Sequence, residues 1–191
     1  VAMIGAGSVV FCKLLMADMM VTPALEGSEF ALMSRSWPKL EKMEHFGKQM
    51  LAENKIKGSV WATLDRREAV KDADFVVVMI QVGGVDAFEL DYKIPLKFGI
   101  DQCVGDTLGP GGVFRALRTI PVLLDIARDM EELAKPGALM LQYSNPMAVN
   151  CLALGRESAV RFTGLCHGIQ TTLQEIATWI GVPKEEISYT C

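Results

Sequence analysis

One stretch of this sequence restricts the possible folds more than any other. It runs from Phe75 to Gln81 and consists of six apolar residues, including three successive valines, followed by a polar exit. A strand with one face in water alternates apolar and polar side chains, whereas an unbroken apolar strand is buried on both faces, as in the middle of a parallel sheet. The stretch therefore predicts a parallel sheet with helices packed against both of its faces.

The rest of the chain alternates strand-like and helix-like patterns in the same way. Further strands are expected at 1–4, 29–33, 59–64, 138–143 and 160–165. Apolar residues recur at helical spacing over 9–20, 39–54, 113–135, about 147–154 and 171–180. This order predicts an α/β fold, a doubly wound, Rossmann-like parallel sheet with helices on both faces.

Two details of the pattern concern helix boundaries. Asp65 and Glu68 have the spacing of a capping box, which predicts a short helix after the strand at 59–64. Pro121 lies inside the long helical pattern and indicates either a kink or a helix start nearer Thr119, because proline lacks the N–H that a helix interior needs.

The segment 93–112 is the least regular part of the chain. It is rich in glycine and proline, yet it also contains large apolar residues such as Ile94, Phe98 and Leu108. Long loops are usually either functional or disordered, and a disordered loop would not normally hold so many apolar side chains. We therefore expect an ordered loop close to the functional site.

Composition excludes several classes of function. Half of the 191 residues are hydrophobic, which favours a heavily buried sheet or a face for a partner, and we expect a homo-oligomer. The net charge of −4 argues against a nucleic-acid partner. Five cysteines without short regular spacing fit a reduced, cytoplasmic setting. No apolar run approaches the roughly 18 residues that a membrane span requires, so no membrane is expected.

Both ends of the chain read as positions inside strands. Val1 already lies in an apolar run that leads into glycines, and Ile187 to Cys191 has the pattern of a strand that is just beginning. Both ends therefore look cut, and a chain of this length is expected to be one domain, or one domain and a piece of another.

The turn Gly5-Ala6-Gly7-Ser8 connects the first strand to the helical pattern that begins at Val9. Glycines at a strand-to-helix turn allow the backbone to approach a pyrophosphate, which the N-terminus of the helix attracts. The dinucleotide fingerprint has a third glycine where this chain has Val10. Two interpretations remain at this point: a dinucleotide site, or a tight turn with no ligand.

The second strand, 29–33, is followed by Ser34-Arg35-Ser36. NAD-binding units usually place an Asp or Glu here to hold the ribose hydroxyls. The missing acid and the added cation are compatible with NADP, with a relaxed choice of cofactor, or with a fold that binds neither. The loop Gln81 to Gly84 leaves the carboxyl end of the central strand, where such sheets bind ligands.

Cys166 and His167 lie where the strand at 160–165 meets the last helical pattern. A thiol beside an imidazole can bind a divalent metal or supply a nucleophile with its base. The plainer interpretation is a buried cysteine next to a partly exposed histidine. His45, the other histidine, lies in the pattern of a surface helix and is expected to be solvated.

Six motifs, in the same order along essentially the whole chain, resemble glycoside hydrolase family 4. They are found at residues 5–8, 80–84, 106–112, 115–121, 143–147 and 164–167. The Asp-Thr-Leu-Gly and Cys-His versions of two of these motifs look closest to the α-galactosidase branch, with the α-glucosidases and α-galacturonidases as near neighbours.

The resemblance implies a chemistry that depends on NAD and Mn²⁺ and differs from the usual pair of carboxylates. NAD would oxidise the hydroxyl at sugar carbon 3, which acidifies the proton at carbon 2. A tyrosine base would remove that proton with assistance from the metal, the aglycone would leave by elimination, and water would add back. The implied substrate is a small glycoside. The resemblance also implies that this is the N-terminal part of a larger two-domain enzyme, in which residues 1–165 form a Rossmann-like dinucleotide-binding domain and residues 166–191 begin the catalytic or substrate domain.

The resemblance also implies roles for individual residues. Cys166 is similar to the thiolate ligand of the metal, and His167 occupies the position of the general acid that protonates the leaving oxygen and contacts the substrate. Asn145 resembles the residue that binds the substrate hydroxyls, and Asp106 the carboxylate that raises the basicity of the tyrosine. The residues expected to contact NAD are Gly5, Gly7, Ser8, Val9, Ser34, Gln81 and Asn145.

Two parts of the implied site are absent from this sequence, since the family's histidine ligand and tyrosine base lie beyond Cys191. Two alternatives stay open for the scaffold. One is an NAD(P)-dependent dehydrogenase for 2-hydroxyacids or polyols, for which His167 is the sole candidate as catalytic histidine. The other is a dinucleotide-binding module without catalysis.

Overall fold

The computed structural model describes residues 1–102, 107–166 and 168–189. These residues form a six-stranded sheet in the order β3-β2-β1-β4-β5-β6, in which every neighbouring pair is parallel. The strands are β1 (Ala2–Ile4), β2 (Glu29–Met33), β3 (Ser59–Thr63), β4 (Phe75–Val78), β5 (Leu139–Gln142) and β6 (Arg161–Gly164). The predicted doubly wound parallel sheet is confirmed.

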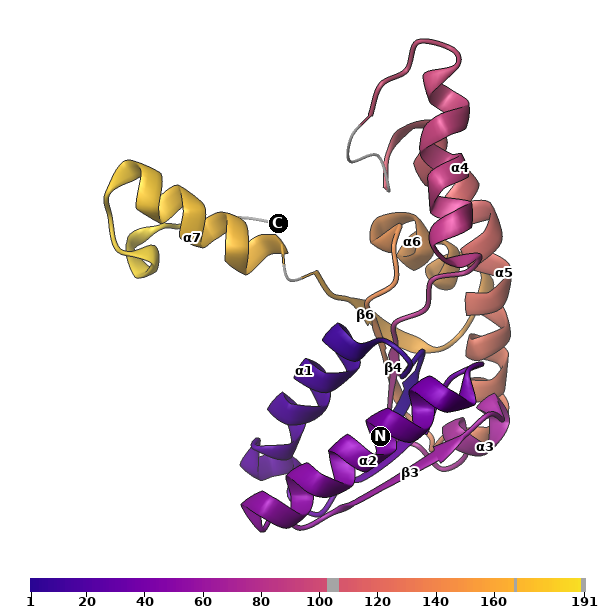
Figure 1. Ribbon diagram of the computed structural model, residues 1–191, viewed down its shortest axis with the longest axis vertical. Helices are drawn as coiled ribbons and strands as arrows, with labels where there is room; N and C mark the ends of the chain where they lie inside the picture. Colours follow the sequence, from indigo (N-terminus) through magenta and orange to yellow (C-terminus); the bar gives the residue numbers. More distant parts are fainter. Residues whose placement is uncertain (103–106, 167, 190–191) are drawn as a thin grey trace.

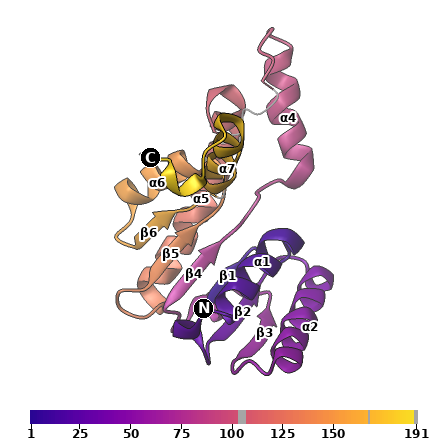
Figure 2. The same cartoon turned by 90° about the vertical axis from the view of Figure 1, so that its left-hand side faces the viewer.

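Helices cover both faces of this sheet (Figures 1 and 2). They are α1 (Val9–Met20), α2 (Trp37–Asn54), α3 (Arg66–Val70), α4 (Gly84–Leu96), α5 (Gly109–Leu133), α6 (Met147–Glu157) and α7 (Gly168–Ile180), with 3-10 turns η1 (Pro23–Leu25) and η2 (Lys184–Glu186). None of the helices in the described ranges is long and apolar enough to cross a membrane.

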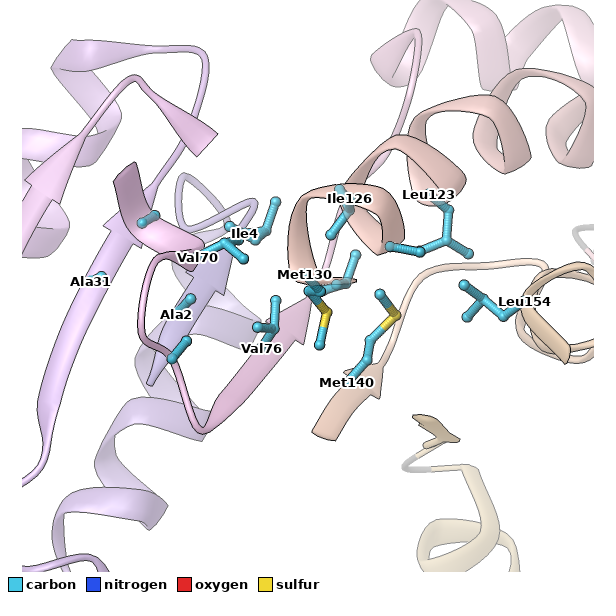
Figure 3. Close-up of a cluster of buried hydrophobic side chains, with 14 residues drawn as sticks. Ala2, Ile4, Ala31, Val70, Val76, Leu123, Ile126, Met130, Met140 and Leu154 are labelled. Carbon is cyan, nitrogen blue, oxygen red and sulfur yellow. The ribbon is translucent and has the colours of Figure 1, made fainter. Parts of the chain in front are cut away.

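Alternate residues of the central strands build two separate cores. Met3 and Val77 lie in the cluster formed with α1 and α2, whereas Ile4 and Val78 lie in the cluster formed with α3, α5 and α6. Figure 3 shows the second cluster, in which Leu123, Ile126 and Met130 of α5 meet the apolar side chains of the strands. Because both sets of side chains are buried, β1 and β4 consist of apolar residues without alternation, as predicted.

The strand order reverses between β1 and β4. The chain first builds β1, β2 and β3 outward in one direction, then returns to place β4 beside β1 and continues to β5 and β6 in the other direction. The connections that leave the carboxyl ends of β1 and β4 therefore diverge. In open α/β sheets this divergence creates the crevice in which ligands bind.

The short helix α3 has the predicted N-cap but only half of the predicted capping box. The Asp65 carboxylate accepts a hydrogen bond from Arg67 N at 2.8 Å. Glu68 does not return to the Asp65 backbone. Its carboxylate accepts from Thr63 Oγ1 at 2.6 Å, and the same Thr63 hydroxyl accepts from Asp65 N at 3.0 Å. The Thr63 hydroxyl thus links the Asp65 backbone to the Glu68 carboxylate, which in a full capping box would bond directly.

The expectation of a loop over 93–112 is wrong at both ends. Helix α4 extends to Leu96, with Pro95 in its last turn, and α5 already begins at Gly109. Pro110 lies in the first turn of α5, where the missing N–H has no partner to lose. Residues 103–106 of this segment lie outside the described residues.

Helix α5 is also longer than predicted at its N-terminus and continues through Pro121. Buried side chains on both sides of the proline, Thr119 and Leu123, anchor the helix to the sheet. Tertiary packing therefore compensates for the hydrogen bond that Pro121 cannot donate. Residues 187–189, expected to begin a strand, join no sheet.

Helix α7 stands apart from the sheet in Figure 1, after the chain leaves β6. Leu173 and Ala177 are buried on one side of it, whereas Trp179 and Ile180 are exposed. The proposed domain boundary between residues 165 and 166 stays a prediction.

Candidate functional site

The register of the sheet aligns the ends of five strands. Met33, Ile4, Val78, Gln142 and Gly164 lie side by side across β2, β1, β4, β5 and β6. The residues that follow them therefore leave the sheet at one edge. Five segments with predicted site residues gather there: 5–9, 34, 79–84, 143–145 and 165–166.

The first of these segments is the glycine turn after β1. Gly5 N and Ala6 N both donate to the carbonyl oxygen of Met33 at 2.9 Å, which holds the turn against the end of β2. Gly5 has φ of +94°, and a Cβ atom there would lie 2.4 Å from Met79 O. Only glycine fits between the two neighbouring strand ends, because the obstacle is backbone.

Gly7 opens a second close approach. A Cβ atom at Gly7 would lie 2.8 Å from Ser34 Oγ, so the absence of a side chain lets the turn lie in direct contact with the residue after β2. Ser8 is the N-cap of α1, and the first turn of that helix contains no acidic residue. The positive end of the helix dipole is therefore available to an anion at this turn.

Val10 occupies the position of the third fingerprint glycine without disturbing the packing. Val10 is 64% exposed and its neighbour Val9 is 63% exposed, so both valines face away from the sheet. The third glycine of a dinucleotide fingerprint serves close packing of helix and strand. Since Cys12 and Met16 make the buried contacts of α1 instead, a valine at position 10 is tolerated.

The loop after β4 is fixed by a residue pair that the sequence did not reveal. Arg118 of α5 donates from Nε to Val82 O at 3.2 Å. Its two terminal nitrogens donate to the two carboxylate oxygens of Asp91 in α4, with Nη1 and Oδ1 2.7 Å apart. Gln81 itself is exposed in this loop, and its Nε2 donates to Gly84 O at 3.3 Å.

A buried polar network fixes the turn that presents Asn145. Ser144 Oγ accepts from Ile80 N at 2.8 Å, which ties the end of β5 to that of β4. The Gln142 side chain bonds to both backbone groups of Ser144, and Asn150 Nδ2 donates to Ser144 O at 3.1 Å. Asn145 is half-buried directly after this network, and its position at the ligand edge agrees with the prediction.

Tyr143 lies in the same segment but has the wrong properties for a general base. Its ring packs against Phe11 of α1, with centroids 6.5 Å apart. Burial and then the negative charge of Asp18 raise the pKa of the Tyr143 hydroxyl above its ordinary value. The hydroxyl therefore keeps its proton at neutral pH.

Cys166 is exposed two residues beyond the end of β6, so its interpretation as a buried structural cysteine is wrong. Gly168 N, in the first turn of α7, donates a hydrogen bond to the Cys166 sulfur at 3.4 Å. The sulfur of Cys166 thus already accepts one hydrogen bond from the backbone, and the thiolate is the form of cysteine that binds metals. His167 and Asp106 lie outside the described residues, so their predicted roles stay predictions.

Gly164 explains how β6 approaches helix α6. A Cβ atom at Gly164 would lie 2.4 Å from the sulfur of Met147 and 2.7 Å from the sulfur of Cys151. The strand that leads to Cys166 is thereby seated on α6, and a larger residue at Gly164 would push the two apart.

The described ranges do not assemble a complete metal centre by themselves. Within them, no group of three or more His, Cys, Asp or Glu side chains lies close enough to hold a metal ion. Cys166 supplies a single sulfur, and manganese prefers harder oxygen and nitrogen ligands. A manganese ion would therefore need further ligands from outside these residues.

A family profile described as family 4 glycosyl hydrolase matches residues 1–182. The chain belongs to glycosyl hydrolase family 4. This confirms the resemblance that the six motifs indicated. The glycine turn, the Ser144-Asn145 turn and the Cys166 segment are thus parts of a family 4 fold.

Two α-galactosidases are similar to this family 4 chain over nearly all of its length. The one from Rhizobium meliloti (strain 1021) is 41% identical over 191 residues, which are 100% of this chain and 39% of that protein. The one from Bacillus subtilis (strain 168) is 37% identical over 188 residues, which are 98% of this chain and 43% of that protein. The chain thus spans about two fifths of these relatives.

A solved structure shows the same fold. The 6-phospho-α-glucosidase from gut microorganisms, determined in complex with NAD and Mn²⁺, has a TM-score of 0.84 and 24% sequence identity. The match covers 97% of this chain and 42% of that chain. At this identity the likeness concerns the fold, which agrees with the predicted Rossmann-like sheet.

Proposed function

We propose that this chain forms the dinucleotide-binding part of an α-galactosidase-like glycosidase that uses NAD and Mn²⁺. The observation that carries the proposal is the glycine turn of Gly5 and Gly7, set between the ends of β2 and β4 in a family 4 chain. The α-galactosidases that are similar over the full chain supply the substrate class. The NAD and Mn²⁺ of the solved relative support the two cofactors.

The residues at the sheet edge fit a dinucleotide. The glycine turn at Gly7 and the N-terminus of α1 without an acidic residue suit a pyrophosphate, because a backbone without a side chain can approach the ligand closely and the helix dipole favours an anion. The loop from Gln81 to Gly84, held by Arg118, would border the other half of the cofactor. When bound, NAD would supply the acceptor for the hydride from sugar carbon 3.

The residues of this chain would prepare the sugar for cleavage. The Asn145 amide, which can donate and accept hydrogen bonds, would hold sugar hydroxyls in place. His167 would hold the proton that the leaving oxygen takes up, and Asp106 would act on the tyrosine base that lies beyond this sequence. Cys166 would supply a thiolate to Mn²⁺, which contributes Lewis-acid chemistry when bound.

Turnover of a chromogenic α-galactoside by the full-length gene product tests the proposal. The assay contains NAD⁺, Mn²⁺ and a thiol reductant, because the exposed Cys166 would otherwise oxidise. We expect release of the chromophore only when both cofactors are present. Omission of NAD⁺ and chelation of the metal serve as separate controls.

Two other results would contradict the proposal. Reduction of NAD(P)⁺ by a 2-hydroxyacid or a polyol, without cleavage of any glycoside, would indicate a dehydrogenase on this scaffold. Dinucleotide binding without turnover of either kind of substrate would indicate a non-catalytic module. The cofactor and product measurements of the same assay separate these outcomes.

A further inference from the structure

Ser34 stands where a dinucleotide fold of this type usually has an acid. An Asp or Glu near the end of the second strand accepts hydrogen bonds from the ribose hydroxyls of NAD, whereas an Arg nearby accommodates the 2′-phosphate of NADP. In this chain β2 ends at Met33, and Ser34 and Arg35 follow. The sequence from 34 to 40 contains no Asp or Glu and two cations, Arg35 and Lys39.

The structure places this segment beside the glycine turn. A Cβ atom at Gly7 would lie 2.8 Å from Ser34 Oγ and 3.5 Å from the Cβ atom of Lys39. Gly5 N and Ala6 N fix the turn to the same strand end through the Met33 carbonyl. Ser34 and Lys39 therefore lie directly against the glycine turn at Gly7.

The positive charges at this position are open to a ligand. Arg35 and Lys39 are exposed, and neither forms an ion pair within the part of the chain that the structure describes. Ser36 is the N-cap of α2, but its hydroxyl makes no capping hydrogen bond, and the first turn of the helix contains no acidic residue. The positive end of the α2 dipole thus adds to the two cations.

We propose that this site accepts a 2′-phosphorylated dinucleotide, NADP, about as well as NAD, and that Ser34, Arg35 and Lys39 recognise the phosphate. The inference rests on the proposed function, since it requires a dinucleotide at the glycine turn. A carboxylate at position 34 would repel the phosphate, whereas the serine hydroxyl can donate a hydrogen bond to it. A guanidinium and an ammonium supply the charge-assisted hydrogen bonds that phosphates prefer.

Dissociation constants for NAD⁺ and NADP⁺, measured by titration calorimetry on the full-length gene product, test this proposal without reference to turnover. We expect the two constants to agree within about tenfold, which corresponds to roughly 1.4 kcal/mol. Adenosine 2′,5′-bisphosphate should bind more tightly than 5′-AMP, because only the former has the 2′-phosphate.

Variants assign the effect to the three residues. Ser34→Asp should raise the preference for NAD⁺ above about a hundredfold, or roughly 2.7 kcal/mol. Arg35→Ala and Lys39→Ala should each weaken NADP⁺ binding by about fivefold to tenfold while leaving NAD⁺ binding unchanged. Lys48→Ala is the matched control, because it removes the same charge from α2 farther along the helix and should alter neither constant.

The possible contrary results are distinct. A preference of the unchanged protein for NAD⁺ above about a hundredfold would overturn this inference and leave the proposed function intact. NADP⁺ affinity that survives both Arg35→Ala and Lys39→Ala would likewise overturn the assignment of the phosphate site. Binding of neither dinucleotide would overturn the inference together with the cofactor on which the proposed function depends.

Discussion

Arg118 and Asp91 form a bidentate ion pair between α5 and α4, and the same guanidinium donates to Val82 O in the loop after β4. The carboxylate is buried and the guanidinium is mostly covered. One side chain therefore connects two helices to a loop at the ligand edge of the sheet. Its contribution is both to stability and to the position of that loop.

Asp91→Ala should destabilise the protein and weaken dinucleotide binding. It leaves a largely buried guanidinium without its partner, which costs about 3 kcal/mol, and frees Arg118 to move away from Val82. Urea unfolding measures the first effect and titration calorimetry with NAD⁺ the second. The matched control is Glu89→Ala on the same helix, where the exposed pair with Lys93 should contribute less than about 1 kcal/mol. Equal effects of both changes would show that the Arg118 pair has no special role.

Substitutions at the two glycines of the turn should have different effects on stability and on NAD⁺ binding. Gly7→Ala should reduce NAD⁺ affinity at least about tenfold, because the new methyl group would lie on the turn that the pyrophosphate is proposed to approach. The fold should persist, because the atom that the methyl group crowds is the hydroxyl of the movable Ser34 side chain. Gly5→Ala should also unfold the protein, since its Cβ atom would meet the backbone of Met79 and φ is positive. Calorimetry and thermal unfolding distinguish the two.

A third glycine provides the control for those substitutions. Gly155 lies in α6, and a Cβ atom there would be 3.6 Å from the nearest atom, in the Phe162 ring, which is an ordinary contact. Gly155→Ala should therefore be neutral or stabilise by up to about 1 kcal/mol, because alanine favours the helix. A loss of NAD⁺ affinity in this variant would contradict the assignment of binding to the turn at Gly5 and Gly7.

Asn145→Ala in the full-length gene product should lose turnover while it retains the fold, and NAD⁺ affinity should fall only slightly because Asn145 is one of several residues expected to contact the cofactor. The neighbouring Ser144→Ala should instead destabilise the protein by about 1–3 kcal/mol, because Ile80 N would lose its buried hydrogen-bond acceptor. Chromogenic turnover, calorimetry and urea unfolding of both variants test the contrast. If Asn145→Ala unfolds as Ser144→Ala does, Asn145 is a turn residue and its proposed contact with substrate is wrong.

The elements that the sequence predicted well are those whose ends are marked by the local sequence. The boundaries of α1 and β2 agree with the prediction, since the run at 29–33 has a buried apolar centre and the glycine turn marks the start of α1. The order of strands and helices was sufficient to predict the parallel sheet, and the register then placed Asn145 and Cys166 beyond the carboxyl ends of its strands.

The parts that the sequence did not reveal depend on contacts between distant residues. Helix α4 was missed because Pro95 reads as a helix breaker, whereas the helix is held through the pairing of Asp91 with Arg118, 27 positions away. The network around Ser144 could not be read from the sequence either, because its link to Ile80 requires that β4 and β5 lie side by side. Half of the capping box failed for a local reason instead, since the hydroxyl of Thr63, two residues before Asp65, took both partners.

Cys166→Ser should abolish Mn²⁺-dependent turnover. The exposed sulfur would lose its role as a thiolate ligand, and a serine hydroxyl keeps its proton at neutral pH. Turnover across a Mn²⁺ titration, together with metal content after dialysis, measures the effect. Cys151→Ser is the control, because this half-buried thiol lies against Met147 and is assigned no ligand role. Unchanged Mn²⁺ content in Cys166→Ser would remove Cys166 from the metal site.

Cys12 should make the protein less stable at alkaline pH. Cys12 lies on the buried side of α1, and the burial of its thiol raises its pKa from 9.0 to about 12. Below pH 9 both the folded and the unfolded chain keep the proton. Between pH 9 and 12 only the unfolded chain releases it, so the free energy of unfolding falls as the pH rises. At pH 9.5 the loss from this one group amounts to about 1 kcal/mol.

Urea unfolding at pH 7.5 and 9.5 tests this expectation. The difference between the two free energies of unfolding should shrink by about 1 kcal/mol in Cys12→Ala, whatever that variant loses in absolute stability through its smaller side chain. Cys151→Ala is the comparison. Burial raises the pKa of the Cys151 thiol as well, but this thiol is only half-buried, so we expect a smaller reduction of the pH effect. The same difference in the unchanged protein and in Cys12→Ala would show that other groups cause the alkaline loss.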